Sequence, residues 1–242
     1  MKLITSKDNP RIKELCKLKD APRDESFLVE GFHLVEMAYQ EGCLDEVYAL
    51  KDPHFEGVEF IQVSEAVLNK LTNTKSPEGI VGLAHTKANK NPNPKRILLL
   101  DKVQDPGNVG TLLRSGLAFG IETFIFTFGT AKKLNDKVIM ASQGAIFTSD
   151  IRYMSEEDAL AFISTSDLPF IATALQGASS LEETKLPKEY ILGLGNEGKG
   201  MSQALLEQST YKVKIPMAKM ESLNVASAGA ILLYLLFMEA KS

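Results

Sequence analysis

Cysteine and histidine are scarce in this sequence, and neither forms a pattern that points to a metal site. The two cysteines, Cys16 and Cys43, form no Cys-x-x-Cys pair and do not have the spacing of metal ligands. The three histidines, His33, His54 and His85, are scattered and lie outside the motifs described below. We therefore expect reduced thiols in a reducing compartment and no bound metal.

The sequence also lacks a hydrophobic run long enough to cross a membrane. Its longest strongly apolar run, residues 228–238, falls short of the roughly 20 residues that a spanning helix needs. Residues 1–13 lack the apolar segment of a secretory signal peptide. Hydrophobic residues make up 44% of the chain and charged residues 24%, which is ordinary for a globular protein. We expect a soluble, cytoplasmic protein with no membrane partner.

Basic side chains are concentrated near the N-terminus. The whole chain has a net charge of −4, which argues against a dedicated nucleic-acid coat protein. Residues 1–23, in contrast, carry seven basic and three acidic side chains. This local excess predicts either a phosphate-binding arm or a solvated amphipathic helix, and the residues alone do not decide between them.

A polar segment over residues 86–96 (TKANKNPNPKR) separates two differently patterned parts of the chain. We predict a smaller α/β domain over residues 1–88, a linker over 89–96 and a second α/β domain over 97–242. In the first domain we expect helices over 10–18, 31–41 and 64–71, and strands over 26–30, 46–50, 59–63 and 80–84.

The second domain shows a regular alternation of strands and helices. Residues 97–101 (ILLLD) form a continuous apolar run, as expected of a strand buried on both faces. Further strands are expected over 123–127, 170–174, 190–194 and 211–215. Helices are expected from about 109 to Gly120 and over 137–147, 156–164, 202–208 and 223–240. This order predicts a largely parallel sheet covered by helices on both sides.

A glycine-rich loop, Gly193–Gly200 (GLGNEGKG), follows the strand expected over 190–194. It matches the dinucleotide-binding pattern, but the acidic residue expected about 20 positions later is replaced by Lys214-Ile215-Pro216-Met217. It also nearly matches a phosphate-binding P-loop, but Gly200 stands where a magnesium-binding Ser or Thr is needed. Both interpretations are weak. The loop favours close approach of its backbone to a ligand, or it is a tight turn that exposes a glutamate.

Two other polar blocks border predicted helices. Asn108 is a candidate helix cap, and Arg114 lies six residues later in a largely apolar helix. Arg114 forms either a structural salt bridge or a contact to ribose and phosphate, for which a guanidinium is well suited. Near the C-terminus, Ser222-Leu223-Asn224 precede a helix that is apolar almost all round and therefore buried.

Together, three blocks resemble the signature of the SpoU (TrmH-like) family of RNA ribose 2′-O-methyltransferases, within the SPOUT superfamily. They are the N-x-G-x-x-x-R block of residues 108–114, the G-x-E-G-x-G block of residues 195–200, and the I-P-M…S-L-N block of residues 215–224. The resemblance covers residues 97–242 well and residues 1–85 more loosely. One departure is that Ala218–Glu221 lacks a glycine that many members have after I-P-M.

The resemblance implies a site that uses S-adenosylmethionine. The residues implied to act in catalysis are Arg114 at the ribose 2′-OH, Asn108, Glu197, Ser222 and Asn224. The residues implied to contact the methyl donor are Thr173, Ala174, Leu175, Gly195, Asn196, Gly198, Ile215, Met217 and Leu223. The residues then favoured as RNA contacts are Lys7, Arg11, Lys13 and Arg23.

The resemblance also implies an architecture and a substrate class. The C-terminal domain is expected to form a deep trefoil knot and to dimerise, with its site at the interface. Residues 1–88 resemble the L30e-like domain of members that act on rRNA, which favours 23S rRNA over tRNA as the substrate. The alternatives are a tRNA methyltransferase, a non-catalytic RNA-binding protein of ribosome assembly and, from the glycine pattern alone, a nucleotide-dependent oxidoreductase.

Overall fold

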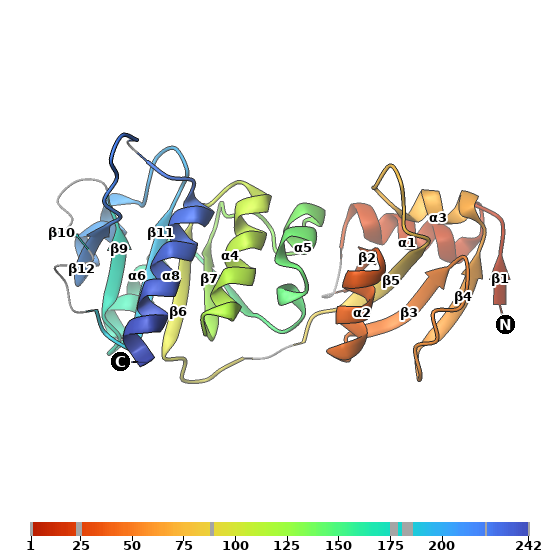
Figure 1. Ribbon diagram of the computed structural model, residues 1–242, viewed down its shortest axis with the longest axis horizontal. Coiled ribbons are helices and arrows are strands. Elements are labelled where there is room, and N and C mark those ends of the chain that lie inside the picture. Colours follow the sequence, from red (N-terminus) through yellow and green to blue (C-terminus); the bar gives the residue numbers. More distant parts are fainter. Residues whose placement is uncertain are drawn as a thin grey trace. The chain divides into compact units, whose positions relative to one another are not determined.

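The computed structural model describes residues 2–22, 26–87, 90–174, 179–180, 186–220 and 222–241, arranged in two compact units (Figure 1). The first unit comprises the described residues of Met1–Ala88 together with Ile146–Thr148. The second comprises those of Asn89–Ala145 and Ser149–Ser242. Each unit has its own sheet, and we describe each by itself.

The first unit is built on a five-stranded mixed sheet in the order β1-β4-β3-β5-β2. Its strands are β1 (Lys2–Ile4), β2 (Ser26–Glu30), β3 (Leu44–Ala49), β4 (Glu59–Val63) and β5 (Ile80–His85). β4 runs parallel to β1 and β3, and β5 runs antiparallel to β3 and β2. Helices α1 (Pro10–Asp20) and α3 (Glu65–Leu71) pack together, and α2 (Phe32–Gln40) packs on β2, β3 and β5.

Local sequence explains where the helices of the first unit begin. The Asn9 side chain accepts a hydrogen bond from the backbone N–H of Arg11, and Pro10 occupies the first helical position of α1. Ser64 caps α3 through the backbone N–H of Val67. The apolar faces of α1 and α3 then close the core over the sheet, with Ile12, Leu15, Leu68, Leu71 and Tyr48 buried.

The second unit is built on a seven-stranded sheet in the order β10-β12-β9-β11-β6-β7-β8, and every strand pair in it is parallel. Its strands are β6 (Arg96–Asp101), β7 (Thr123–Thr127), β8 (Asp150–Met154), β9 (Phe170–Thr173), β10 (Ser179–Ser180), β11 (Tyr190–Gly195) and β12 (Tyr211–Lys214). The central strands β6, β7 and β11 are buried throughout apart from Arg96. The predicted parallel α/β sheet is therefore confirmed.

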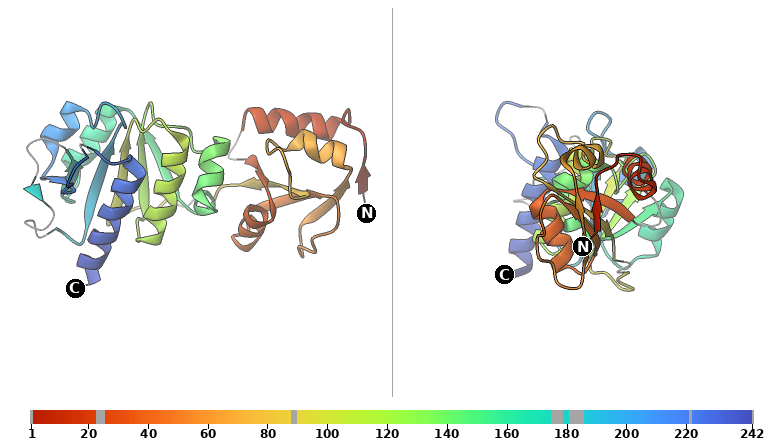
Figure 2. Two further views of the ribbon diagram at one scale, coloured as in Figure 1. Left: turned by 45° about the horizontal axis from the view of Figure 1, so that its top comes forward. Right: turned by 90° about the vertical axis from the view of Figure 1, so that its right-hand side faces the viewer.

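Two helical layers cover this sheet (Figure 2). On one face α4 (Pro106–Ala118) packs against α5 (Asp136–Ser142) and α8 (Val225–Lys241). On the other face α6 (Glu156–Thr165) packs against α7 (Gln203–Gln208) over β7, β8 and β9. A short 3-10 helix, η1 (Ala145–Phe147), follows α5. In the described part of the chain, no helix is both long and apolar enough to span a bilayer.

The structure differs from the sequence-based expectations in a few elements. The helix expected over 137–147 breaks after Ser142, because Gln143 and Gly144 adopt positive φ angles of 48° and 91°. The helix expected over 223–240 begins at Val225. Strands β1, β8 and β10 were not expected. The trefoil knot and the L30e-like likeness stay predictions.

Candidate active site

The three sequence blocks meet at the carboxyl edge of the parallel sheet, where ligand sites of such sheets are built. Strands β6 and β11 are neighbours, and their last residues, Asp101 and Gly195, are paired. The loop after β6 therefore leaves the sheet beside the glycine-rich loop after β11. The segment after β12 leads past the same edge into α8 (Figure 1).

The loop after β6 ends in a capped helix that places Asn108 at the site. The cap of α4 is Asp105, whose carboxylate accepts a hydrogen bond from the backbone N–H of Asn108 at 2.8 Å, and Pro106 occupies the first helical position. The expectation that Asn108 caps this helix is therefore wrong. Since Asp105 fills that role, the side chain of Asn108 in the first turn is available for contacts outside the helix.

Asn196 gives the glycine-rich loop its shape. Its Nδ2 donates to the carbonyl oxygen of Lys102 at 2.8 Å, and its Oδ1 accepts from the backbone N–H groups of Gly198 and Lys199 at 3.0 Å each. Backbone hydrogen bonds in both directions between Asn196 and Gly200 close the loop. The next helix begins only at Gln203. A dinucleotide-binding loop and a phosphate-binding P-loop both lead directly from their glycines into a helix, whose N-terminus binds the phosphates. Because no helix begins there, both of those interpretations fail.

Glu197 joins the glycine-rich loop to the loop after β6. Its carboxylate accepts hydrogen bonds from the backbone N–H groups of Gln104 at 3.2 Å and Asp105 at 3.1 Å, and from Asn108 Nδ2 at 3.1 Å. Partial burial raises the pKa of Glu197, but the hydrogen bonds from Asn108 and from these backbone groups outweigh that effect and hold its pKa below the ordinary glutamate value. The carboxylate is therefore ionised at neutral pH and is a weak proton acceptor.

A chain of side-chain hydrogen bonds connects all three blocks. Asn224 Nδ2 donates to Asn108 Oδ1 at 2.9 Å, and Asn108 in turn donates to Glu197. The side-chain Oδ1 of Asn224 accepts from the backbone N–H groups of Ala226 and Ser227, so the same side chain caps α8. The side-chain amides of Asn108 and Asn224 are therefore each held at both the oxygen and the nitrogen, which fixes their orientation.

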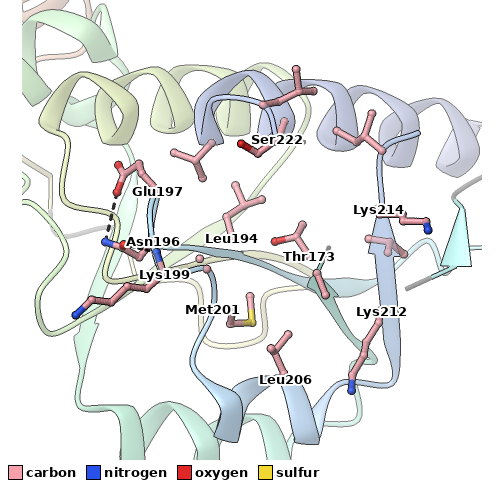
Figure 3. Close-up of a pocket in the computed structure, with 18 of the residues that line it drawn as sticks. Thr173, Leu194, Asn196, Glu197, Lys199, Met201, Leu206, Lys212, Lys214 and Ser222 are labelled. Atoms are coloured by element: carbon pink, nitrogen blue, oxygen red, sulfur yellow. Dashed lines mark hydrogen bonds between the residues drawn. The ribbon is translucent and has the colours of Figure 1, made fainter. Parts of the chain in front are cut away.

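These elements enclose a cavity of about 840 Å³ at the edge of the sheet (Figure 3). Asn196 and Glu197 lie at one end of it, Lys212 and Lys214 lie at the other, and Ser222 lies on the side of α8. Eight of the residues expected to contact a methyl donor line this cavity: Thr173, Ala174, Gly195, Asn196, Gly198, Ile215, Met217 and Leu223. The ninth, Leu175, lies outside the described residues.

Gly195 shows how closely the backbone is packed at this cavity. A Cβ atom on Gly195 would lie 2.1 Å from the backbone nitrogen of Met201 and 2.3 Å from the carbonyl carbon of Gly200. Backbone atoms cannot yield as a flexible side chain does. A Cβ on Gly198, in contrast, would meet nothing nearer than 3.8 Å. Gly195 is therefore sterically required here and Gly198 is not.

Of the predicted catalytic residues, Glu197 and Ser222 line the cavity, and hydrogen bonds connect Asn108 and Asn224 to Glu197. Arg114 does neither. It lies two turns into α4 and is exposed, and its side chain makes no hydrogen bond or ion pair with another described residue. Six residues after Asn108, it lies about 9 Å further along the helix axis and faces another direction. The alternative of a structural salt bridge therefore finds no support among the described residues.

The predicted RNA-binding residues of the first unit are not equally available for a ligand. Arg11 is held by Glu14 at 2.7 Å, by Glu46 at 2.6 Å and by the hydroxyl of Tyr48 at 3.1 Å. Lys13 forms an exposed ion pair with Asp8. A further predicted residue, Lys7, is exposed, and Arg23 lies outside the described residues.

Sequence reasoning did not single out several residues of the cavity wall. Lys199 comes from the glycine-rich loop, and Lys212 and Lys214 come from alternate positions of β12. The alternation of these two lysines around the buried Val213 is the signal that would have placed both on one face of the strand. The apolar part of the wall includes Leu194, Met201, Leu206, Val225 and Leu232.

Comparison with known proteins identifies the family. Residues 95–234 match the SpoU rRNA Methylase family, and residues 9–82 match the MRM3-like substrate binding domain. The chain belongs to the SpoU rRNA Methylase family. This membership confirms the resemblance found in the three sequence blocks.

Members of this family and related structures match nearly the whole chain. The chain is 32% identical over 244 residues to the 23S rRNA (guanosine(2553)-2′-O)-methyltransferase RlmP of Bacillus subtilis, covering 97% of this chain and 98% of that protein. A crystal structure of an RNA 2′-O ribose methyltransferase has 33% identity and a TM-score of 0.82, with 99% of each chain covered. The AdoMet-bound rRNA methyltransferase of Sinorhizobium meliloti has 26% identity and a TM-score of 0.85, covering 99% of this chain and 97% of that one.

Proposed function

We propose that this protein transfers a methyl group from S-adenosylmethionine to a ribose 2′-hydroxyl of rRNA, with 23S rRNA as the favoured substrate. The observation that carries the proposal is the hydrogen-bonded chain Asn224–Asn108–Glu197, which lies where the glycine-rich loop borders the cavity. The activity of the Bacillus subtilis relative, named for 2′-O-methylation of 23S rRNA, supports the same reaction.

The cavity suits S-adenosylmethionine in size and in chemistry. Its volume of about 840 Å³ falls within the usual range of small-molecule sites. Apolar side chains such as Leu206 and Leu223 provide walls for an adenine ring, and the backbone around Gly195 provides polar groups at close range. When bound, this cofactor supplies an electrophilic methyl group.

The side chains beside the cavity are suited to orienting the acceptor rather than to removing its proton. Asn108 has a second Nδ2 hydrogen beyond the one given to Glu197, and the Ser222 hydroxyl lies at the cavity wall. Both can hold a ribose hydroxyl in line for displacement, where alignment contributes strongly to rate. Because the pKa of Glu197 is lowered, that carboxylate is a poor base. The proton of the 2′-hydroxyl leaves to an RNA phosphate or to water.

Arg114 acts, in this proposal, at the ribose oxygen of a site that is completed by a second copy of the chain. Its guanidinium stays protonated and stabilises negative charge that develops on the 2′-oxygen. The support is its exposure and its absence from the wall of the cavity in its own chain. A homodimer through the C-terminal domain would bring the Arg114 of one chain to the cavity of the other.

An apolar stripe on α8 supports this homodimer. Ile231, Tyr234 and Leu235 are 40%, 48% and 40% exposed and lie on one face of the helix. The exposed side chain of Met238 extends this face by one turn. Exposed apolar surface of this kind marks an interaction site. α8 packs on α4, the helix that carries Arg114, so contact through this face brings both helices to the interface.

We propose that residues 1–88 form the RNA-binding domain, joined by residues 89–96 to the catalytic domain of residues 97–242. The match of residues 9–82 to a substrate binding domain supports this assignment. Of the described residues predicted to contact RNA, Lys7 and Lys13 are the better candidates for phosphate contacts, because Arg11 is engaged by two carboxylates. An rRNA substrate would place the protein in the cytoplasm.

The proposal is tested by transfer of labelled methyl from S-adenosylmethionine to deproteinised 23S rRNA, 16S rRNA and bulk tRNA. We expect label in 23S rRNA with the wild-type protein and its loss, by two orders of magnitude or more, with Arg114→Ala. Arg114→Lys separates charge from geometry: near-normal turnover would rule out a specific role of the guanidinium. Label in tRNA alone would refute the assignment of the substrate.

A further inference from the structure

A strongly exposed phenylalanine lies beside the catalytic loops and has no part in the site described so far. Phe128 follows β7 and is 63% exposed, the largest exposed fraction among the aromatic side chains of the described residues. Exposing a phenyl ring to water costs free energy that burial would recover. We propose that Phe128 is a stacking platform for an unpaired base of the substrate RNA, at or next to the methylated nucleotide.

Phe128 stands on a rigid turn rather than on a mobile loop. The backbone N–H of Thr130 donates to the carbonyl oxygen of Thr127 at 3.0 Å, which closes a β-turn over Phe128 and Gly129. Gly129, the third residue of this turn, has a φ of +105°, which favours glycine. The N–H of Phe128 donates to the carbonyl oxygen of Met154 at 3.0 Å, so the turn is also fixed to the end of β8.

The threonines on either side anchor this turn to β6. The hydroxyl of Thr130 donates to the carbonyl oxygen of Leu100 at 3.0 Å, and that of Thr127 donates to the buried carboxylate of Asp101 at 2.9 Å. Both threonines are buried. These contacts hold the backbone of Phe128 in place at the surface, which lowers the entropic cost of binding a ligand there.

The turn also contacts the loop that holds the catalytic groups. A Cβ on Gly129 would lie 3.3 Å from the Cγ atom of Lys102, so the two residues pack together. The backbone carbonyl oxygen of Lys102 accepts the hydrogen bond from Asn196. Two residues later, the backbone N–H of Gln104 donates to the carboxylate of Glu197. Phe128 is thus placed by the same loop that positions the Asn224–Asn108–Glu197 chain.

The surroundings of Phe128 favour RNA over a protein as the partner. Lys132 and Lys137, both exposed, follow within ten residues and provide positive charge for phosphates. A ribose that enters the cavity carries its nucleotide out of the RNA stack, and an aromatic ring compensates the stacking that is lost. The inference rests on the proposed function, because only an RNA substrate supplies such a base.

The first test compares the Michaelis constant for deproteinised 23S rRNA between the wild type, Phe128→Ala and Phe128→Tyr. Loss of base stacking is expected to raise KM roughly 5- to 150-fold in Phe128→Ala. Phe128→Tyr should stay within about 3-fold of wild type, because a tyrosine ring also stacks. Met140→Ala is the matched control, since Met140 is an exposed apolar residue of the following helix, α5. Calorimetric binding of S-adenosylmethionine should not change in any of these variants.

A second test reads stacking directly and needs no catalysis. The sequence has no tryptophan, so Phe128→Trp introduces a single fluorescent reporter. Its emission should be quenched when deproteinised 23S rRNA is added and should not change with S-adenosylmethionine alone. Met140→Trp should report no quenching with either.

Three results would count against the proposal in different ways. An unchanged KM in Phe128→Ala, with active wild type, overturns the stacking role and leaves the proposed function standing. A change in sedimentation of Phe128→Ala with unchanged RNA affinity assigns the residue to a protein contact and also overturns the role. A wild type that neither binds nor methylates RNA removes the proposed function, and the stacking role with it.

Discussion

Asn224 donates a hydrogen bond to Asn108 across 116 residues of sequence, at a distance of 2.9 Å. This contact ties the start of α8 to the first turn of α4, and through Asn108 it reaches Glu197 in the glycine-rich loop. Three blocks that are separate in sequence thereby become one polar arrangement beside the cavity. The predictions below follow from that arrangement and from the packing around it.

Replacing Asn224 should separate catalysis from helix capping. Asn224→Ser keeps an oxygen that can cap α8 but is too short to reach Asn108, so the unfolding free energy should change by less than about 0.5 kcal/mol while turnover falls at least 10-fold. Asn224→Ala should lose turnover and, in addition, about 1 kcal/mol of stability. Thermal unfolding and initial rates of methyl transfer decide this. Wild-type turnover in Asn224→Ser would show that the contact is only structural.

Glu197 should contribute a stability that depends on pH in one direction. Because hydrogen bonds hold its folded-state pKa below the ordinary value of 4.5, the ionised carboxylate stabilises the fold above that value. The contribution is lost as pH falls through the lower, folded-state pKa. Glu197→Gln should therefore melt below the wild type at pH 7, and the difference should narrow when the pH falls below 4.5. A difference in melting temperature that is constant from pH 7 to pH 4 would contradict this account.

Two glycines of one loop should respond differently to the same substitution. Gly195→Ala forces a Cβ against the backbone of Gly200 and Met201, so we expect a loss of about 1–3 kcal/mol in stability and weakened binding of S-adenosylmethionine. Gly198→Ala places its Cβ at an ordinary contact distance, 3.8 Å from Asn196 Oδ1, and serves as the control for stability. Differential scanning calorimetry and donor titration measure both effects. Equal behaviour of the two variants would refute the steric argument.

The apolar stripe of α8 should govern assembly. We expect the wild type to sediment as a dimer and Leu235→Glu as a monomer, because the variant places a charge within the exposed face of Ile231, Tyr234 and Leu235. Because Leu235 is exposed in the single chain, the fold itself should tolerate the change. Ala161→Glu on the exposed side of α6 is the control. A dimer that persists in Leu235→Glu would locate the interface elsewhere.

Buried strands were the elements that the sequence predicted best. β6, β7 and β11 are apolar on both faces and were expected within one residue of their observed bounds. β8 was missed because it is an edge strand, in which Asp150 and Arg152 interrupt any apolar pattern. The break in the helix after Ser142 depends on the left-handed conformation of Gln143, a residue with no special preference for it.

The site was predicted in its parts but not in its contacts. The residue types in the three blocks pointed to the right edge of the sheet, and the described donor-contact residues line one cavity. The hydrogen bond from Asn224 to Asn108 depends on chain topology, which spacing in the sequence does not encode. For the same reason, nothing in the sequence indicated that Arg114 lies away from the cavity of its own chain, or that Asp105 rather than Asn108 caps α4.

Identification of the methylated atom tests the central claim most directly. Deproteinised 23S rRNA is incubated with the protein and S-adenosylmethionine and digested to nucleosides, which are then separated and analysed by mass spectrometry. The account predicts one nucleoside with its added methyl group on the ribose, which also makes the adjacent linkage resistant to alkali, and no such product with Asn108→Ala. A methyl group on a base, or no methylated nucleoside despite measurable binding of the donor and the RNA, would contradict it.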